Sequence, residues 1–276
     1  MSSAAQRWTQ QLAAWAIPDD IVAAAPESPY GFPSEPFRRR AAHAESRDRV
    51  PTTVRAIEAL PEGGTVLDVG TGGGATSLPL AGRASTIVGV DGQPDMLLLF
   101  EAAGRTANVR TARVLGRWPD VEEKTPKADV VVCGHVVYNV ADLAPFVLAL
   151  DGHAATRVVL ELTDRHPLAW MGDLWQRFHG LARPDGPTVD DAVAVLEEVG
   201  LTPTRQDWIP GDEERAGGFD SREDAIALVR RRLCLTRDFD DEIGRALGER
   251  LNERGGVWSS GPVKRTVVTL WWNVRR

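Results

Sequence analysis

The sequence predicts an α/β protein built around a doubly wound, mostly parallel sheet of seven strands. Short apolar runs alternate with helical patterns from residue 65 to residue 162, and such unbroken runs are typical of strands buried on both faces of a parallel sheet. A glycine-rich turn follows the first run, and a β-branched and aromatic run comes at residues 263–272. With 276 residues, the chain fits one large domain with added segments.

The individual elements follow from the periodicity of the apolar residues. The expected strands are residues 65–69, 86–90, 109–115, 128–133, 157–162, 202–209 and 263–272. The expected helices are residues 52–60, 75–82, 95–107, 142–150, 188–200, 221–235 and 240–251. The last two of these helices predict a helical insertion before the final strand.

The N-terminal segment does not continue this alternation. Trp8, Leu12 and Trp15 fall at helical spacing and predict a short amphipathic helix, and Pro18 can start a second one. Beyond these residues, closely spaced prolines predict a loop rather than a further helix.

This proline-rich loop has aromatic anchors, which are Tyr30, Phe32 and Phe37. A flexible linker would instead be rich in glycine and serine, so we expect the loop to be ordered. We therefore interpret residues 1–50 as a helical and loop-containing lid segment and residues 51–276 as the core domain.

The charge balance argues against a long nucleic acid as partner. The formal net charge is −7, whereas proteins that grip a phosphate backbone carry a strong basic surface. Two local arginine runs, at residues 38–40 and 230–232, are interpreted as solvated helix faces in preference to phosphate sites.

The cysteine content favours a reducing, cytoplasmic setting. Cys133 and Cys234 are the two cysteines of the chain, and neither belongs to a Cys-x-x-Cys motif. The sequence shows no apolar run long enough for a transmembrane helix and no signal-peptide pattern in its first twenty residues, so we expect no membrane association.

The glycine-rich turn carries the main functional signal. Residues 68–75 are Asp-Val-Gly-Thr-Gly-Gly-Gly-Ala, placed between an expected strand and an expected helix. Glycine lets the backbone approach a ligand closely, and a helix N-terminus behind the turn favours a negative group. Asp91 ends the second expected strand, where an acid can accept hydrogen bonds from both ribose hydroxyls. The two features together predict a nucleoside-containing cofactor.

Two cofactors fit this pattern. Gly70, Gly72 and Ala75 match the looser fingerprint of a nicotinamide-dinucleotide site. Asp68 favours S-adenosylmethionine instead, because a carboxylate beside the turn would repel a pyrophosphate but attract the α-ammonium of an amino acid.

Residues 66–74 and 88–97 resemble the first and second motifs of class I S-adenosylmethionine-dependent methyltransferases, and residues 128–133 resemble the fourth strand of that family. The resemblance covers about residues 51–165 and implies S-adenosylmethionine as the cofactor. The cofactor contacts that it implies are Asp68, Gly70, Thr71, Gly72, Asp91, Gly92, Gln93, Met96, Arg117, Trp118 and His135.

The resemblance also implies which part of the cofactor these residues face. The glycine turn and Asp68 would line the methionine part, Asp91 would take the ribose, and Gln93 would lie against the adenosine. Met96 fits either the adenosine or the core. Trp118 departs from the family pattern, and stacking on adenine and filling space in the core both fit it.

The candidates for catalysis follow the fourth and fifth strands. Methyl transfer needs mainly alignment and a dry pocket, with a general base only where the acceptor must lose a proton. His135 and Tyr138 follow the fourth strand, and His166 follows the fifth. Asp164, which also follows the fifth strand, could reach the same cleft. The alternatives are that His135 only contacts the cofactor and that Asp164 only caps a helix. The spacing of His, Cys and Asp predicts no metal site.

The sequence therefore predicts a methyltransferase with a small-molecule acceptor. Residues 134–139 lack the Asn-Pro-Pro-Tyr type motif of amino-directed DNA and protein methyltransferases. RNA or protein methylation and non-catalytic binding of S-adenosylmethionine stay as alternatives. A dinucleotide-dependent oxidoreductase is less favoured, because Asp68 opposes it and a Tyr-x-x-x-Lys pair is missing. The sequence leaves the oligomeric state open.

Overall fold

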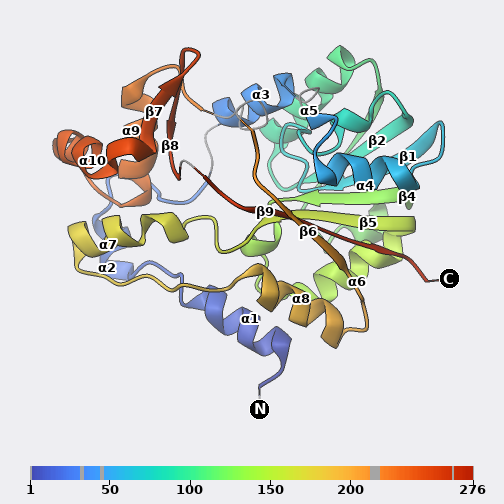
Figure 1. Cartoon of the computed structure of the whole chain (residues 1–276), viewed down its shortest axis with the longest axis horizontal. Helices are drawn as coiled ribbons and strands as arrows, with labels where there is room; N and C mark the ends of the chain where they lie inside the picture. The colour runs from blue at the N-terminus through green and yellow to red at the C-terminus, as the bar shows by residue number, and fades with distance from the viewer. Residues whose placement is uncertain (1, 32–33, 44–46, 212–217, 263, 276) are drawn as a thin grey trace.

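The computed structural model describes residues 2–31, 34–43, 47–211, 218–262 and 264–275 (Figure 1). Within them, a seven-stranded sheet has the order β3-β2-β1-β4-β5-β9-β6. The strands are β1 (Gly64–Val69), β2 (Ala84–Asp91), β3 (Arg110–Leu115), β4 (Ala128–Gly134), β5 (Ala154–Thr163), β6 (Thr204–Trp208) and β9 (Val267–Asn273). The first five strands are parallel, and β9 runs antiparallel to β5 and β6. The predicted doubly wound, mostly parallel sheet is confirmed.

Helices cover both faces of this sheet, as Figure 1 shows. Successive strand residues point to opposite faces, so Val66 packs with α4 and α5 while Leu67 packs with α1, α6 and α8. These helices are α1 (Ala4–Ala13), α4 (Pro51–Ala59), α5 (Pro94–Thr106), α6 (Leu143–His153) and α8 (Val189–Glu198). The strand order reverses between β1 and β4. Because β1, β2, β4 and β5 are parallel, their carboxyl ends lie at one edge of the sheet.

The expected helix at residues 75–82 is wrong. The chain there forms turns and one short 3-10 helix, η2 (Leu78–Leu80), with Pro79 at its centre. Proline lacks the amide hydrogen of a helix interior, and its ring clashes with the preceding turn. Other 3-10 turns are η3 (Glu122–Lys124), η4 (Val137–Asn139), η5 (Ala169–Met171), η6 (Arg237–Phe239) and η7 (Gly248–Arg250).

The N-terminal segment divides among three places. The first helix, α1, buries Trp8 against the sheet-covering helices, and α2 (Asp19–Ala24) places Ile21 on a separate cluster of helices. A third helix, α3 (Ser34–Ala42), forms where the sequence predicts a loop, because Pro36 lies in the first turn, where proline is tolerated. Phe32 lies outside the described residues.

A second, smaller cluster includes the insertion before the last strand. It contains α7 (Gly172–His179), α9 (Arg222–Arg232) and α10 (Asp240–Leu247), which pack through Leu174, Ile226 and Ile243. The predicted helix over 240–251 ends early, and a hairpin of β7 (Leu251–Arg254) and β8 (Val257–Ser260) follows it. Gly255 and Gly256 turn this hairpin at positive φ angles of 57° and 79°.

Candidate cofactor and acceptor site

The glycine turn after β1 needs glycine for two physical reasons. Gly70 and Gly72 have φ angles of 72° and 50°, a region that side chains disfavour. A Cβ on Gly70 would also lie 2.3 Å from Cγ2 of Val136, and one on Gly72 would lie 3.0 Å from Cδ1 of Phe37. The turn is therefore bounded by the loop after β4 on one side and by α3 on another.

Asp68 lies buried beneath this turn with one oxygen unpaired. The hydroxyls of Thr71 and Ser77 donate to its Oδ2 over 2.9 and 2.6 Å. Its Oδ1 is buried and has no hydrogen-bond partner within the described part of the chain. Burial raises the pKa of Asp68 to about 6, against the lowering effect of the two hydroxyls. An orphaned carboxylate oxygen beside a glycine turn fits the α-ammonium of S-adenosylmethionine, directly or through water.

Asp91 joins the ends of β1 and β2. Its Oδ2 accepts from the amide of Gly72, and its Oδ1 accepts from the amide of Gln93, each over 2.9 Å. The side chain of Arg117 lies nearby, with its Cγ 3.7 Å from the position of a Cβ on Gly92. The structure thus brings these predicted cofactor residues together at one edge of the sheet.

Two other predicted cofactor residues lie in the interior. Trp118 is 9% exposed, donates from Nε1 to the carbonyl of Phe146 over 3.3 Å, and meets the ring of His153 edge-on. Met96 is 4% exposed on α5. These contacts favour the core interpretation of Trp118 over adenine stacking.

His135 forms an ion-pair geometry with Glu161 beside the glycine turn. Its Nε2 lies 3.0 Å from Oε1 of Glu161, and its neighbour Val136 packs on Gly70. The backbone of His135 has a φ angle of 59°, which is uncommon for residues other than glycine, and such backbones cluster at functional sites. The side chain is 44% exposed, so the ring is accessible from solvent.

Glu161 is the buried centre of this group. Nη2 of Arg47 donates to both of its oxygens over 2.7 Å, and the hydroxyl of Thr52 donates to Oε2 over 2.6 Å. Burial alone would raise the pKa of Glu161, but Arg47 and His135 overcome this effect and lower it to about 2. Glu161 is therefore ionised at neutral pH.

The imidazole of His135 is neutral at the same pH. Desolvation lowers its pKa below the ordinary value, and the bond to Glu161 opposes this only in part. A neutral ring that donates from Nε2 to Glu161 keeps the lone pair of Nδ1, and this tautomer is inferred from the hydrogen bond.

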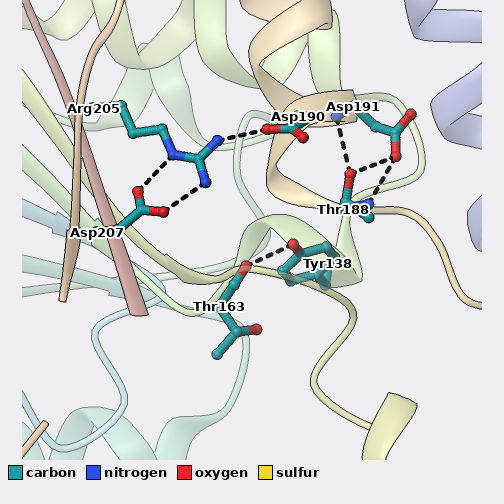
Figure 2. A network of polar contacts seen from close by, with 7 residues as sticks. All are labelled: Tyr138, Thr163, Thr188, Asp190, Asp191, Arg205 and Asp207. Carbon is teal, nitrogen blue, oxygen red and sulfur yellow. Dashed lines mark hydrogen bonds and ion pairs between the residues drawn. The ribbon is translucent and has the colours of Figure 1, made fainter. Parts of the chain in front are cut away.

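Tyr138 lies deeper, in a polar network that stabilises the fold. Its hydroxyl donates to the carbonyl of Thr163 over 2.7 Å, and its ring stacks near Trp8. Figure 2 shows this phenol pointing at the end of β5, close to the capping pair of Thr188 and Asp191. Burial raises the pKa of Tyr138, which opposes a role as proton acceptor.

The same view contains the ion pairs that tie β6 to α8. Arg205 donates to Asp207 within its own strand and to Asp190 on α8 (Figure 2). These groups are exposed to solvent, so each pair contributes little to stability. The network in Figure 2 therefore has structural roles, and we do not place the reaction there.

His166 is also enclosed by aromatic rings. It is 9% exposed and stacks on Trp15 with ring centroids 3.8 Å apart. Desolvation, with Arg183 and Arg265, lowers its pKa to about 4. The geometry favours His135 over Tyr138 and His166 as the group that faces an acceptor.

The two arginine runs make internal contacts. Arg39 of the first run pairs with Asp220. In the second run, Arg230 pairs with Asp240 over 2.8 Å, while Arg231 and Arg232 donate to backbone carbonyls of residues 28–31. The second run therefore anchors the loop that leads to α3, which differs from the expected solvated helix face.

Glu161, Arg47 and Thr52 are the site residues that the sequence analysis missed. Glu161 could have been found, because an acid within the apolar run at residues 157–162 is buried only when it is paired. Arg47 and Thr52 carry no such signal, since both lie far from β5 in the sequence.

Among the described residues, the structure contains no group of three or more His, Cys, Asp or Glu side chains that could hold a metal ion. The same residues include no helix with the length and apolar character needed to cross a bilayer.

One family of known proteins matches part of the chain. A family model described as a methyltransferase domain matches residues 66–150, which contain the glycine turn, Asp91 and the loop after β4. These residues match a methyltransferase domain, in agreement with the two motifs that resemble class I S-adenosylmethionine-dependent methyltransferases. S-adenosylmethionine is the cofactor of this family, as the first two motifs imply.

One curated methyltransferase is similar to this chain over a limited stretch. A ubiquinone biosynthesis O-methyltransferase from Azorhizobium caulinodans is 35% identical over 81 residues, which are 29% of this chain and 32% of that protein. The match thus spans about a third of the curated relative.

Two solved structures share the fold over most of the chain. The YcgJ protein from Bacillus subtilis has a TM-score of 0.52 and 14% identity, covering 82% of this chain and 98% of that one. A putative methyltransferase from Bacillus halodurans has a TM-score of 0.51 and 16% identity, covering 81% and 98%. At these identities the likeness concerns the fold alone.

Proposed function

We propose that the protein is a methyltransferase that transfers the methyl group of S-adenosylmethionine to a hydroxyl oxygen of a small molecule. The observation that carries this proposal is the pair of His135 and Glu161, 3.0 Å apart and adjacent to the glycine turn through Val136. His135 is accessible and neutral, as a base must be, and would lie where a methyl acceptor approaches, while Glu161 is buried beside it.

The residues of the turn would bind and orient the cofactor. Asp68 would face the α-ammonium with its unpaired Oδ1. Asp91 would accept hydrogen bonds from the ribose hydroxyls, in place of or in addition to its present bonds from backbone amides. Gly92, Gln93 and Arg117 would border the adenosine.

The local backbone also favours this cofactor over a dinucleotide. The expected helix behind the turn is replaced by turns and η2, so the helix N-terminus that would hold a pyrophosphate is missing from this described stretch. Asp68 adds a negative charge at the same place. Both features disfavour the oxidoreductase alternative.

The chemistry divides between the cofactor and the protein. S-adenosylmethionine, when bound, would supply the methyl group for the acceptor oxygen, and its sulfur would keep the electron pair of the broken C–S bond. His135 would take the hydroxyl proton on Nδ1 as the new C–O bond forms. Glu161 would hold the ring through Nε2 and stabilise the imidazolium that results.

We further propose that residues 1–50 act as the lid segment on the core domain of residues 51–276, with α3 as its working part. Phe37 covers Gly72, and Arg231 and Arg232 fix the loop before α3 to α9. A lid at this place would exclude water from the sulfonium.

Several observations favour a small acceptor over RNA or protein. The net charge is −7, and Arg39 and Arg230 are already paired with acids. The name of the similar O-methyltransferase agrees with transfer to oxygen, although the aligned part is limited to 81 residues. Binding without catalysis would leave the His135–Glu161 pair without a purpose.

Calorimetric titration with S-adenosylmethionine and, separately, with NAD tests the cofactor. We expect dissociation constants of roughly micromolar order for the first and no measurable binding of the second. A panel of hydroxylated small molecules is then screened for S-adenosylhomocysteine formation by mass spectrometry. Binding of NAD alone would overturn the proposal, and tight cofactor binding without turnover on any hydroxylated acceptor would favour a non-catalytic protein.

A further inference from the structure

Three guanidinium groups gather at the acceptor side of His135, where one buried carboxylate is present. Arg47 comes from the segment before α4, Arg40 from α3, and Arg265 from the segment before β9. The charges of Arg40 and Arg265 both act on His135, and the charge of Arg40 acts on Arg265 as well. The three groups are therefore neighbours in space, although they are distant in sequence.

Glu161 is already saturated by other partners. Its two oxygens accept from Arg47, from Thr52 and from His135. Arg40 lies 5.9 Å from the ring centroid of Phe37 and makes no hydrogen bond or ion pair within the ranges that the structure describes. Glu161 therefore pairs directly with Arg47. Its charge also acts on Arg40, but no ion pair with an acid is formed by Arg40 in the described part of the chain.

Arg265 is similarly short of a counter-charge. Its Nη2 donates over 3.2 Å to the hydroxyl of Thr163, which is uncharged. The nearest acid that acts on it is Asp164, whose Oδ2 also lies 3.5 Å from Nε of Arg165. Desolvation lowers the pKa of Arg265 to about 10, as expected for a charge held away from water without a close ion pair.

The two arginines border the place where an acceptor must lie. Arg40 follows Phe37 by one helical turn, and Phe37 covers Gly72 of the cofactor turn. Thr163, which Arg265 contacts, is two residues beyond Glu161 on β5 and so points to the same face of the sheet. Arg40 is exposed, so a ligand can reach it from solvent.

We infer that the methyl acceptor carries an anionic group, a carboxylate or a phosphate, that Arg40 and Arg265 bind beside His135. The inference deepens the proposed function and rests on it for the identity of the ligand as a methyl acceptor. A planar guanidinium pairs with two oxygens of such an anion at once. The anion would also raise the proton affinity of His135, which the two arginines otherwise lower, and so bring the base closer to neutral pH.

The test uses the full chain with S-adenosylhomocysteine and three non-reacting probes: benzoate, phenyl phosphate and the neutral benzamide. We expect benzoate or phenyl phosphate to bind at least about tenfold more tightly than benzamide in calorimetry. The tighter of the two anions identifies the acidic group as carboxylate or phosphate. Equal binding of all three probes would overturn the inference.

Arginine variants assign the preference to these side chains. Arg40→Gln and Arg265→Gln should each reduce the preference for the anion to less than about threefold, whereas Arg265→Lys, which keeps the charge, should retain part of it. Arg39→Gln is the matched control on the same helix, because Arg39 pairs with Asp220. A preference for the anion that survives both glutamine variants would overturn the inference. Arg40 is exposed, so Arg40→Gln should fold even if Arg265→Gln does not.

The same samples separate this inference from the proposed function. S-adenosylmethionine binding is titrated for each variant and should change by less than about threefold, because neither arginine is among the atoms nearest to Gly70, Gly72 or Gly74. Cofactor binding without anion preference would refute the anionic acceptor and leave the methyltransferase proposal standing. Anion preference that depends on the two arginines, in a protein that does not bind S-adenosylmethionine, would refute the proposed function instead.

Discussion

Asp68, Gly72 and Asp91 come from a single strand–turn–strand unit, whereas Arg40, Glu161 and Arg265 come from three segments that are far apart in the chain. The first set forms the cofactor side of the site, and its members contact one another through backbone amides and short hydroxyl bonds. The second set forms the proposed acceptor side, which is held by long side chains around one buried carboxylate.

This difference reflects what each side must recognise. The cofactor is the same throughout the family, so its site can be fixed by a local motif whose spacing is visible in the sequence. The acceptor differs between family members, and its site is assembled from whatever side chains tertiary packing brings to the carboxyl ends of β4 and β5. The predictions below separate the two sides by what each variant does to cofactor binding and to turnover.

The largest effect is expected on the acceptor side, at His135. His135→Asn keeps a residue that tolerates the positive φ of 59°, and it removes the proton acceptor. Turnover should fall by roughly 10²- to 10⁴-fold, the usual contribution of a general base, while the dissociation constant of S-adenosylmethionine should change by less than about threefold.

The pH profile of turnover gives an independent readout. Because desolvation lowers the pKa of His135 in the free protein, the wild-type kcat/KM should stay constant down to pH values below the ordinary histidine pKa and fall only as the ring becomes protonated. His153→Gln, on α6 away from the site, serves as the control. If His135→Asn weakens cofactor binding as much as turnover, His135 is a cofactor contact and not a base.

Asp91 should give the next largest effect, and on the cofactor side alone. Asp91→Ala removes the acceptor of the ribose hydroxyls and the bonds from Gly72 and Gln93. We expect S-adenosylmethionine to bind roughly 100-fold more weakly, since hydrogen bonds to a charged group contribute about 1.5–3 kcal/mol each. Asp95→Ala, which removes the same charge from the exposed first turn of α5, should bind almost normally in calorimetry. Near-native affinity of Asp91→Ala would contradict the placement of the ribose.

The fold illustrates what the periodicity of a sequence can predict. The seven strands and the helices α5, α6 and α8 follow from apolar runs and helical spacing, because both arise from burial against one sheet. The helix at 75–82 fails because its apolar residues are spaced for a helix while Pro79 prevents one. The reverse error, at α3, arises because Pro36 looks like a breaker but lies in a first turn.

The site follows the same division. Asp68, Gly72, Asp91 and Gln93 could be predicted because the motif that contains them is local, and the structure brings them together. Arg40, Arg47 and Arg265 could not be predicted, because their placement depends on how α3 and the segment before β9 pack against β5. Trp118 shows that a local position in the sequence can also mislead. Its place after β3 suits an adenine contact, but its ring is buried beside Phe146.

The smallest predicted effect concerns Asp68, which sets cofactor binding against stability. Its pKa of about 6 in the folded protein lies above the unfolded value of about 3.9, so its contribution to stability is fully present below pH 4 and is lost as the pH rises through 6. Asp68→Asn removes the buried charge and should raise the free energy of unfolding at pH 7.5 by about 1–2 kcal/mol. Thermal and urea denaturation without cofactor measure this gain.

The same substitution should weaken S-adenosylmethionine about tenfold, because the α-ammonium loses its counter-charge. Wild-type affinity should fall as the pH drops through about 6, where Asp68 becomes protonated, whereas the affinity of Asp68→Asn should be constant over that range. Asp129→Asn is the matched control, since Asp129 accepts from the amide of Thr65 near the start of β4, remote from the turn.

The two measurements on Asp68→Asn are read together. If it is less stable than wild type at pH 7.5, yet binds the cofactor equally well, Asp68 supports the turn through Thr71 and Ser77 and does not meet the cofactor. A stabilised variant with weakened binding would instead show that the cofactor side keeps an unpaired buried charge for the sake of its ligand.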